Sequence, residues 1–253
     1  MISLPLLKQT VKSNWVMWAA ITAVSTLLCV QFAAMDMVQN LLFVIFYGMM
    51  TTILPGIYVL VTANKLLASQ VDRGSMAYVL STPIKRSTVA FTQIVYITAS
   101  LVLMFAFQTA AHIIVNAVTP ISFETLGYVQ LSGDITSKII LQVNLSALMV
   151  CVALSAVCFM FSGIFNTSKF SIGLSGIFIG ESILANMLAM FGNLGAADGL
   201  DNFKYMTICS FYDYESVMLG ENDWLIKMIF PIGIAVVAFA IGGIVFKKKD
   251  LPL

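Results

Sequence analysis

Long apolar stretches separated by short polar segments make up most of the sequence. Six of these stretches are long enough to cross about 30 Å of hydrocarbon at a rise of about 1.5 Å per residue. Most charged residues fall in the segments between them. The pattern predicts an all-α, polytopic membrane protein with six transmembrane helices, over Trp15–Met35, Leu41–Ala63, Val89–Val115, Ile139–Phe161, Phe170–Phe191 and Trp224–Phe246.

The composition supports this interpretation. Of the 253 residues, 60% are hydrophobic and 10% are charged, whereas soluble domains have about 45–50% apolar and about 25% charged residues. A soluble domain of this length could not cover so much apolar surface with so few charges. The polar segments are also too short for a separate domain, so residues 1–253 are expected to form a single transmembrane domain.

The basic residues predict an orientation. With the N-terminus on the cytoplasmic side, ten of the 13 lysines and arginines fall on that side. Cytoplasmic loops of membrane proteins carry such an excess of basic residues. We therefore expect a multi-pass protein of a bacterial plasma membrane with both termini in the cytoplasm. The cytoplasmic set is Lys8, Lys12, Lys65, Arg73, Lys85, Arg86, Lys169, Lys247, Lys248 and Lys249.

The segment before the first span has its own pattern. Its apolar residues recur at helical spacing next to two lysines, as in helices that lie on a membrane surface. A cytoplasmic extension of the first span is the alternative. The surface helix is the favoured prediction, and its residues are Leu4, Leu7, Lys8, Val11, Lys12 and Trp15.

The loop between the second and third spans is amphipathic. Apolar residues recur along Lys65–Arg86, and Asp72-Arg73-Gly74-Ser75 interrupts them in the middle. Pro83 ends the second half. The pattern is compatible with a helical hairpin or bent helix, rigidly joined to two spans, that can pass a push from a cytoplasmic partner to the bundle, although spacing alone favours the alternative. The alternative is a connecting loop whose apolar side chains pack under the bundle.

Three motifs resemble those of one transporter family. Asp72-Arg73-Gly74-Ser75 precedes Val79-Leu-Ser-Thr-Pro-Ile-Lys-Arg86 in the loop, Phe211-Tyr-Asp-Tyr214 precedes the last span, and Phe246-Lys-Lys-Lys-Asp-Leu-Pro252 ends the chain. With six spans, this order is similar to that of the type-2 ABC (ATP-binding cassette) transporter permeases. One position departs from the family, which often has Glu where Gln70 stands.

The resemblance implies the permease subunit of an ABC exporter. Two such subunits, identical or related, would surround a path for a hydrophobic or amphipathic cargo such as an antimicrobial peptide or a drug. Two separate ATPase subunits would bind ATP and Mg²⁺ and dock on the loop, which corresponds to the family's coupling helix. The candidate docking residues are Gln70, Asp72, Arg73, Gly74, Met76 and Tyr78.

The chain itself is expected not to be an enzyme. It has no G-x-x-x-x-G-K-[ST] loop to hold ATP phosphates, and a single histidine makes a metal site unexpected. No cofactor is therefore expected in this chain, and a net charge of +1 suggests no nucleic-acid partner. The alternatives are an ATP-independent channel or assembly factor and, less favoured, an intramembrane enzyme.

Polar residues inside the predicted spans are candidates for function, because ionisable groups are costly in lipid. Glu181, Asn186, Gln108 and His112 either line the translocation path or hold helices together by hydrogen bonds. Gly176-Ile-Phe-Ile-Gly180 is a G-x-x-x-G motif, which allows two helices to approach closely. It predicts either a dimer face or internal helix packing.

Overall fold

The computed structural model describes residues 2–35, 42–82, 84–120, 122–123, 133–193, 199–218, 220 and 223–250. Of the residues named above, Leu41, Pro83, Leu251 and Pro252 lie outside these ranges.

Six of the described helices are long and apolar enough to cross a membrane. They coincide in order with the six predicted spans, which confirms six helices long and apolar enough to span a membrane, consistent with a multi-pass membrane protein. Each helix extends beyond the predicted span at one end or both. They are α1 (Leu4–Ala34), α3 (Thr51–Leu66) together with the end of the preceding π-helix, α6 (Arg86–Val118), α7 (Ser137–Ile164), α8 (Ser168–Asn193) and α10 (Asp223–Lys248).

Shorter elements connect the long helices. A π-helix, η1 (Leu42–Met50), runs directly into α3, and two short helices, α4 (Ala68–Asp72) and α5 (Ser75–Leu80), follow it. Between α6 and α7, the two-residue strands β1 (Ser122–Phe123) and β2 (Gly133–Asp134) pair antiparallel. Two 3₁₀-helices and one α-helix lie between α8 and α10: η2 (Leu200–Met206), η3 (Ile208–Phe211) and α9 (Tyr214–Met218).

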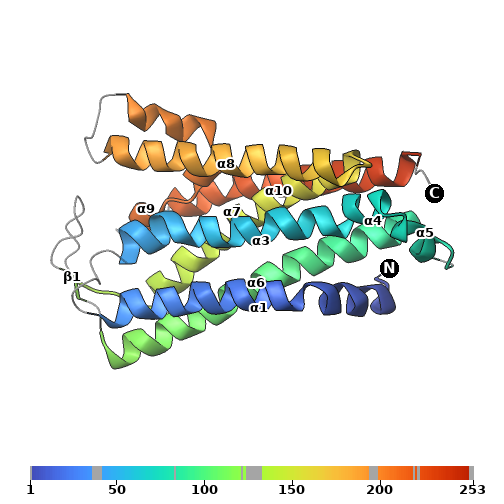
Figure 1. Ribbon diagram of the computed structural model, residues 1–253. Coiled ribbons are helices and arrows are strands. Elements are labelled where there is room, and N and C mark those ends of the chain that lie inside the picture. Colours follow the sequence, from blue (N-terminus) through green and yellow to red (C-terminus); the bar gives the residue numbers. More distant parts are fainter. Residues whose placement is uncertain are drawn as a thin grey trace.

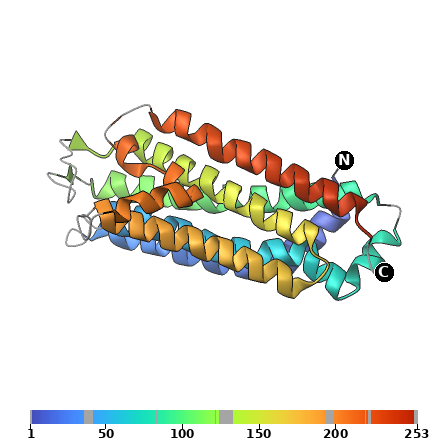
Figure 2. The same ribbon diagram turned by 90° about the horizontal axis from the view of Figure 1, so that it is seen from above.

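The long helices form an elongated bundle around α7, which packs against α10, α3, α6 and α8. In Figure 1, α8 lies along one side of the bundle and α1 along the other, with α3 between them. Both chain termini lie at the same end as α4 and α5, as Figures 1 and 2 show. We call this end the hairpin end and the opposite end the far end.

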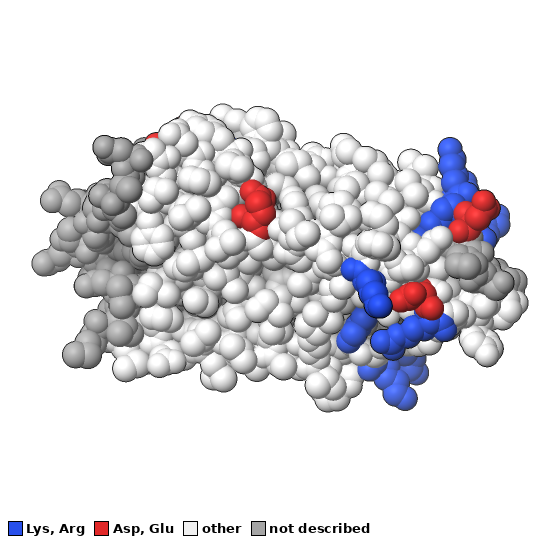
Figure 3. All heavy atoms as spheres, turned by 45° about the horizontal axis from the view of Figure 1, so that its top comes forward, with Lys and Arg blue, Asp and Glu red and all other residues white. Residues whose placement is uncertain are grey.

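Charge is distributed along the bundle as the sequence predicts. Figure 3 shows Lys and Arg side chains gathered at the hairpin end, whereas the middle of the visible surface is uncharged apart from one small acidic patch. An uncharged middle suits contact with hydrocarbon, since charged side chains there are costly.

The first helix differs from the prediction. A separate surface helix was expected before the first span, but α1 is continuous from Leu4 to Ala34. No helix breaker follows Pro5, and buried polar contacts hold this part of α1 against α6: Ser3 N–H donates to Thr92 Oγ1 at 3.0 Å, and Thr10 Oγ1 donates to Gln93 Oε1 at 3.2 Å. Of the expected apolar stripe, Leu4, Val11 and Trp15 are exposed.

The junction of η1 and α3 accommodates a proline inside a span. Pro55 has no N–H, so the carbonyl of Thr51 loses its partner in the helix. The thiol of Cys151 on α7 lies 3.8 Å from this oxygen and donates to it. In hydrocarbon, a freed backbone group has to find such a partner within the protein.

The segment between α8 and α10 folds back beside α8 instead of only connecting two helix ends. Thr207 Oγ1, directly after η2, donates to the carbonyl of Ser182 at 2.8 Å. Ser182 precedes the end of α8 at Asn193 by 11 residues, which corresponds to about 16 Å along the helix axis. The segment 199–213 therefore reaches well into the bundle from the far end, and we call it the re-entrant segment.

Two glycines bring α7 and α10 into close contact. A Cβ atom on Gly163 would lie 2.5 Å from the carbonyl oxygen of Gly242, and one on Gly242 would lie 2.9 Å from Cα of Met160. Both distances are too short for a side chain, so glycine is required where the two backbones meet. Ala153, Ala156, Ala235 and Ala238 continue the contact between the two helices with small side chains.

The close contact of α7 and α10 predicts that the stability of the bundle is sensitive to replacement of Gly163. Gly163→Ala should destabilise the bundle by about 1–3 kcal/mol, the usual effect of overpacking, because its methyl group would meet the backbone of α10. A lowered thermal unfolding midpoint of the detergent-purified protein measures the effect. Gly243→Ala is the matched control, since a Cβ atom there meets nothing within 4 Å. Equal midpoints for the two variants would contradict the close contact.

Candidate functional site

The hairpin between the second and third spans consists of α4 and α5. Gly74 separates them with φ of +70°, a left-handed conformation that glycine adopts without strain. One face of the hairpin packs on the bundle through Val71 and Met76, which are almost completely buried, as are Leu66 and Leu67 directly before the hairpin. The sequence therefore forms the expected helical hairpin at the end of the molecule.

Hydrogen bonds join the hairpin to the junction of α7 and α8. Ser162 Oγ accepts from the backbone N–H of Ala68 at 3.0 Å, and Asn64 Nδ2 donates to Ser168 Oγ at 2.7 Å. Asp72 Oδ2 accepts from the N–H of Ser168 at 3.2 Å. A carboxylate at a helix N-terminus satisfies a free N–H and interacts favourably with the helix dipole. Asp72 thus stabilises the start of α8.

The C-terminal motif lies beside the same junction. Arg86 Nη1 donates to the carbonyl of Lys249 at 2.8 Å, and Lys249 Nζ donates to the carbonyl of Phe165 at 3.0 Å. Burial lowers the pKa of Lys249 to about 8. Phe246 is completely buried. Two of the motifs that carry the family resemblance are therefore in direct contact.

The candidate docking residues divide into exposed and supporting positions. Asp72, Arg73 and Tyr78 are exposed, and Tyr78 has 80% of its surface accessible. Gln70 is partly exposed and donates from Nε2 to the carbonyl of Lys65 at 3.3 Å. Met76 is completely buried, so it supports the hairpin from beneath. The surface available to a partner therefore consists mainly of Asp72, Arg73 and Tyr78.

The interior polar residues form one hydrogen-bonded network across four elements. Ser25 Oγ on α1 donates to Gln108 Oε1 at 2.7 Å, and Gln108 Nε2 donates to Asn144 Oδ1 at 2.9 Å. Asn144 Nδ2 on α7 donates to the hydroxyl of Tyr47 on η1 at 2.9 Å. That hydroxyl lies 2.7 Å from His112 Nδ1. All five side chains are buried, so Gln108 and His112 join helices in the bundle interior.

Glu181 lies away from this interior network, on the surface of the bundle. It lines a shallow groove on the outer face of α8, together with Gly176, Gly180, Leu184 and Met206. A Cβ atom on Gly180 would meet nothing within 4 Å, and one on Gly176 would only touch Leu60 at 3.9 Å. The structure therefore does not bring Glu181 to Gln108. The glycine at position 180 is not used for packing within the described chain.

Asn186 lies neither in the interior network nor in the groove of Glu181. It donates from Nδ2 to the carbonyl of Gly48 at 3.2 Å and lines a cavity of about 560 Å³ in the far half of the bundle. The re-entrant segment and α9 form much of its wall, including Asp213 and Glu215. Sequence reasoning missed this cavity, because nothing local in the sequence shows that Asn186 meets Asp213 and Glu215. The Phe211–Tyr214 motif was the one signal that pointed to it.

No protein-family model matches the sequence, and a search of curated proteins finds no match. The resemblance to type-2 ABC permeases therefore depends on the motifs themselves and on where they lie in the fold.

The interior network predicts a large stability effect at Asn144. Asn144→Leu should destabilise the bundle by about 2 kcal/mol, because the Tyr47 hydroxyl and the Gln108 amide would both lose a buried partner. Thermal unfolding of the purified protein measures the loss. Gln31→Leu removes an exposed amide from α1 and is the control. A midpoint for Asn144→Leu that equals that of the control would show that the network does not hold the helices together.

Proposed function

We propose that this chain is the transmembrane permease subunit of an ABC exporter. A separate ATPase subunit, present in two copies and binding ATP and Mg²⁺, would dock on the hairpin α4–α5. Cargo would then leave the cell through a path that opens when the docked subunits close. The six membrane-crossing helices and the motifs at the hairpin end support this proposal.

The observation that carries the proposal is the way the hairpin is built. It exposes an acidic, a basic and an aromatic side chain, Asp72, Arg73 and Tyr78, at the end where the basic residues gather (Figure 3). It is also bonded to the start of α8 through Asp72 and Asn64. Force applied to a loosely attached loop would be dissipated, whereas a hairpin joined to several spans would move them together.

The composition of the bundle supports the proposed hydrophobic or amphipathic cargo. Its walls are apolar, and the cavity at the far half combines aromatic and polar side chains. This combination suits a hydrophobic or amphipathic cargo.

A second subunit is expected on the outer face of α8. Ile177 and Leu184 are 69% and 62% exposed on this face, next to Gly180. Glu181 lies in the middle of the span, and a carboxyl group at that depth is costly against lipid. A second permease subunit, identical or related, would cover the carboxyl group and the glycine surface. Of the two predictions for the G-x-x-x-G motif, a dimer face or internal helix packing, the proposal adopts the dimer face.

The docking proposal predicts which side chains the ATPase needs. Arg73→Ala and Tyr78→Ala should each reduce capture of the ATPase encoded in the neighbouring reading frame by about tenfold, since charge-assisted and aromatic contacts carry such interfaces. The measurement is co-purification of the ATPase with the tagged chain from membranes. Asp72→Ala is a poorer choice, because it also removes a bond to the N-terminus of α8.

Lys12→Ala is the matched control for the docking variants. Lys12 is exposed on α1 near the same end but lies outside the hairpin. The Lys12→Ala variant should capture as much ATPase as the unchanged chain does. Undiminished capture by both hairpin variants, with expression and thermal midpoint also unchanged, would contradict docking at this surface.

The subunit pairing predicts a cross-link at position 180. In membranes, Gly180→Cys should form a covalent dimer with a short bismaleimide, because the two α8 helices would lie close together. The native Cys29, Cys151, Cys158 and Cys209 are all buried, so their background should be low. Val236→Cys, on the exposed face of α10, is the control and should stay monomeric. The absence of any cross-linked product at position 180, with this chain or a related one, would argue against this face.

A further inference from the structure

The cavity in the far half of the bundle has a mixed lining. Its volume is about 560 Å³, and η1, α8, the re-entrant segment, α9 and the start of α10 all contribute to it. Apolar and aromatic side chains make up one part of the wall, and charged side chains make up the other. The aromatic residues are Tyr205, Phe211, Tyr212 and Tyr214, and the charged ones are Lys204, Asp213, Glu215 and Lys227.

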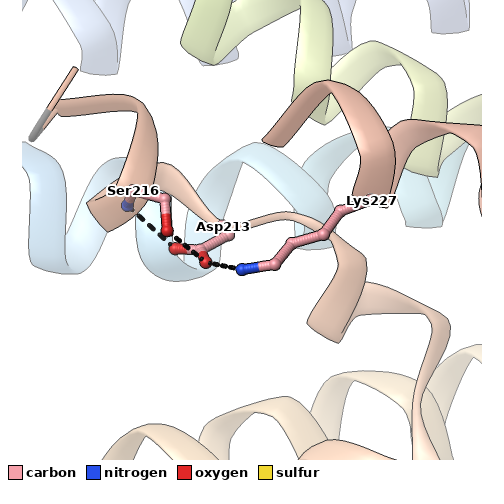
Figure 4. Close-up of polar contacts among 3 residues, drawn as sticks. All are labelled: Asp213, Ser216 and Lys227. Atoms are coloured by element: carbon pink, nitrogen blue, oxygen red, sulfur yellow. Dashed lines mark hydrogen bonds and ion pairs between the residues drawn. The ribbon is translucent and has the colours of Figure 1, made fainter. Parts of the chain in front are cut away.

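Two of the four charges neutralise each other. Asp213 pairs with Lys227, as Figure 4 shows, and its carboxylate also accepts from the backbone N–H of Ser216 at 3.0 Å and from the Ser216 hydroxyl at 2.7 Å. Burial alone would raise the pKa of Asp213, but the hydrogen bonds from Lys227 and Ser216 outweigh it and keep this pKa below its usual value. This pair therefore stabilises the wall and leaves little free charge for a ligand.

Glu215 is different, because it has no basic partner. Among the described residues, the ion pair of Asp213 and Lys227 is the only one. Glu215 is about half-buried, and burial and the nearby Asp213 raise its pKa, although a hydrogen bond from Tyr214 acts in the opposite direction. A cation beside Glu215 would favour its charged form. The cavity thus contains an uncompensated, partly desolvated carboxylate.

The remaining basic residue of the lining, Lys204, contributes little to the electric field in the cavity. Lys204 is exposed, and its ammonium group lies 5.3 Å from the centre of the Tyr205 ring. Solvent and salt screen a charge in this position, whereas they screen the half-buried Glu215 less. The field inside the cavity is therefore set mainly by the carboxylate.

The aromatic wall suits the rest of such a ligand. Phe211 stacks on Phe230 with ring centres 5.2 Å apart, and Tyr212 lies 6.0 Å from Tyr214. These contacts hold the rings in place. Ring faces attract cations and also pack against apolar groups. In addition, the buried hydroxyl of Tyr212 has no hydrogen-bond partner among the described residues, so a polar group of a ligand that reached it would satisfy it.

We infer that this cavity binds the positively charged end of an amphipathic amine, with the ammonium group beside Glu215 and the apolar part against the aromatic wall. This inference does not depend on the permease function, because binding is a property of the isolated chain. If the chain is an exporter, the cavity is a site on the exit side of the path.

The test uses the full chain in lipid nanodiscs and a matched pair of soluble probes. At neutral pH, 4-phenylbutylamine is a cation, whereas 4-phenylbutyrate is an anion of similar size. Isothermal titration calorimetry should detect binding of the amine, while the carboxylate should bind no better than to empty nanodiscs. Glu215→Gln keeps the shape of the side chain and should weaken amine binding by about tenfold or more, as expected for loss of a charge-assisted contact.

Two further variants complete the test. Asp201→Asn removes a negative charge from the same segment but outside the cavity lining, and it should leave amine binding unchanged. Lys204→Gln removes the exposed cation of the lining and, because solvent and salt screen this charge, should change amine binding far less than Glu215→Gln does. Equal binding of both probes, or undiminished amine binding by Glu215→Gln, would overturn the inference. If Glu215→Gln does not fold, the probe pair on the unchanged chain decides: binding of the amine without binding of the carboxylate supports the inference, and any other result overturns it.

Discussion

Backbone polar groups that enter the hydrocarbon layer need partners inside the protein, and many buried polar side chains of this bundle are held by partners on neighbouring helices in the same way. The network from Ser25 to His112 connects amide, hydroxyl and imidazole groups on four elements. Pro55 frees a carbonyl group, and a cysteine thiol on the neighbouring helix bonds to it. The polar side chains therefore act mainly as fixed connections between helices whose outer surfaces are apolar.

The two ends of the bundle are built differently. At the hairpin end, the bonds of Asp72, Arg86 and Lys249 tie short elements to the ends of long helices. At the far end, the re-entrant segment goes back into the bundle and its Thr207 bonds to the backbone of α8. One end thus has a surface held in place by hydrogen bonds, and the other end encloses a cavity.

How much could be predicted from the sequence depends on whether a feature is local. Hydropathy located six spans because length and apolar composition are properties of one segment, and Gly74 marked a turn by its residue type alone. The partner of Gln108 could not be predicted in this way, since Ser25 is 83 residues away and any polar residue in a span is a possible partner. Glu181 illustrates the same limit, because its depth in the span did not reveal which side of α8 it faces.

One wrong prediction and one missed feature have physical causes. The first helix was expected to break before Trp15, but the amphipathic pattern cannot distinguish a surface helix from a helix whose polar side is buried against Thr92 and Gln93. The polar residues of the segment 199–213 are typical of a connection exposed to solvent, and the sequence alone does not show that this segment folds back beside α8. In the folded chain, Asp213 has its own cation, Lys227, so polarity there reflects internal pairing as well as exposure.

The geometry of α8 links the two functional regions. Its first residue, Ser168, bonds to Asp72 and Asn64 at the hairpin end, and its Asn186 lines the cavity. These positions are 18 residues apart, or about 27 Å along a helix axis, and no proline interrupts the helix between them. A tilt of the hairpin that displaces Ser168 would therefore also displace the wall that carries Asn186. Under the permease proposal, docking at Arg73 and Tyr78 would in this way change the shape of the cavity beside Glu215, with no separate signal needed through the interior network.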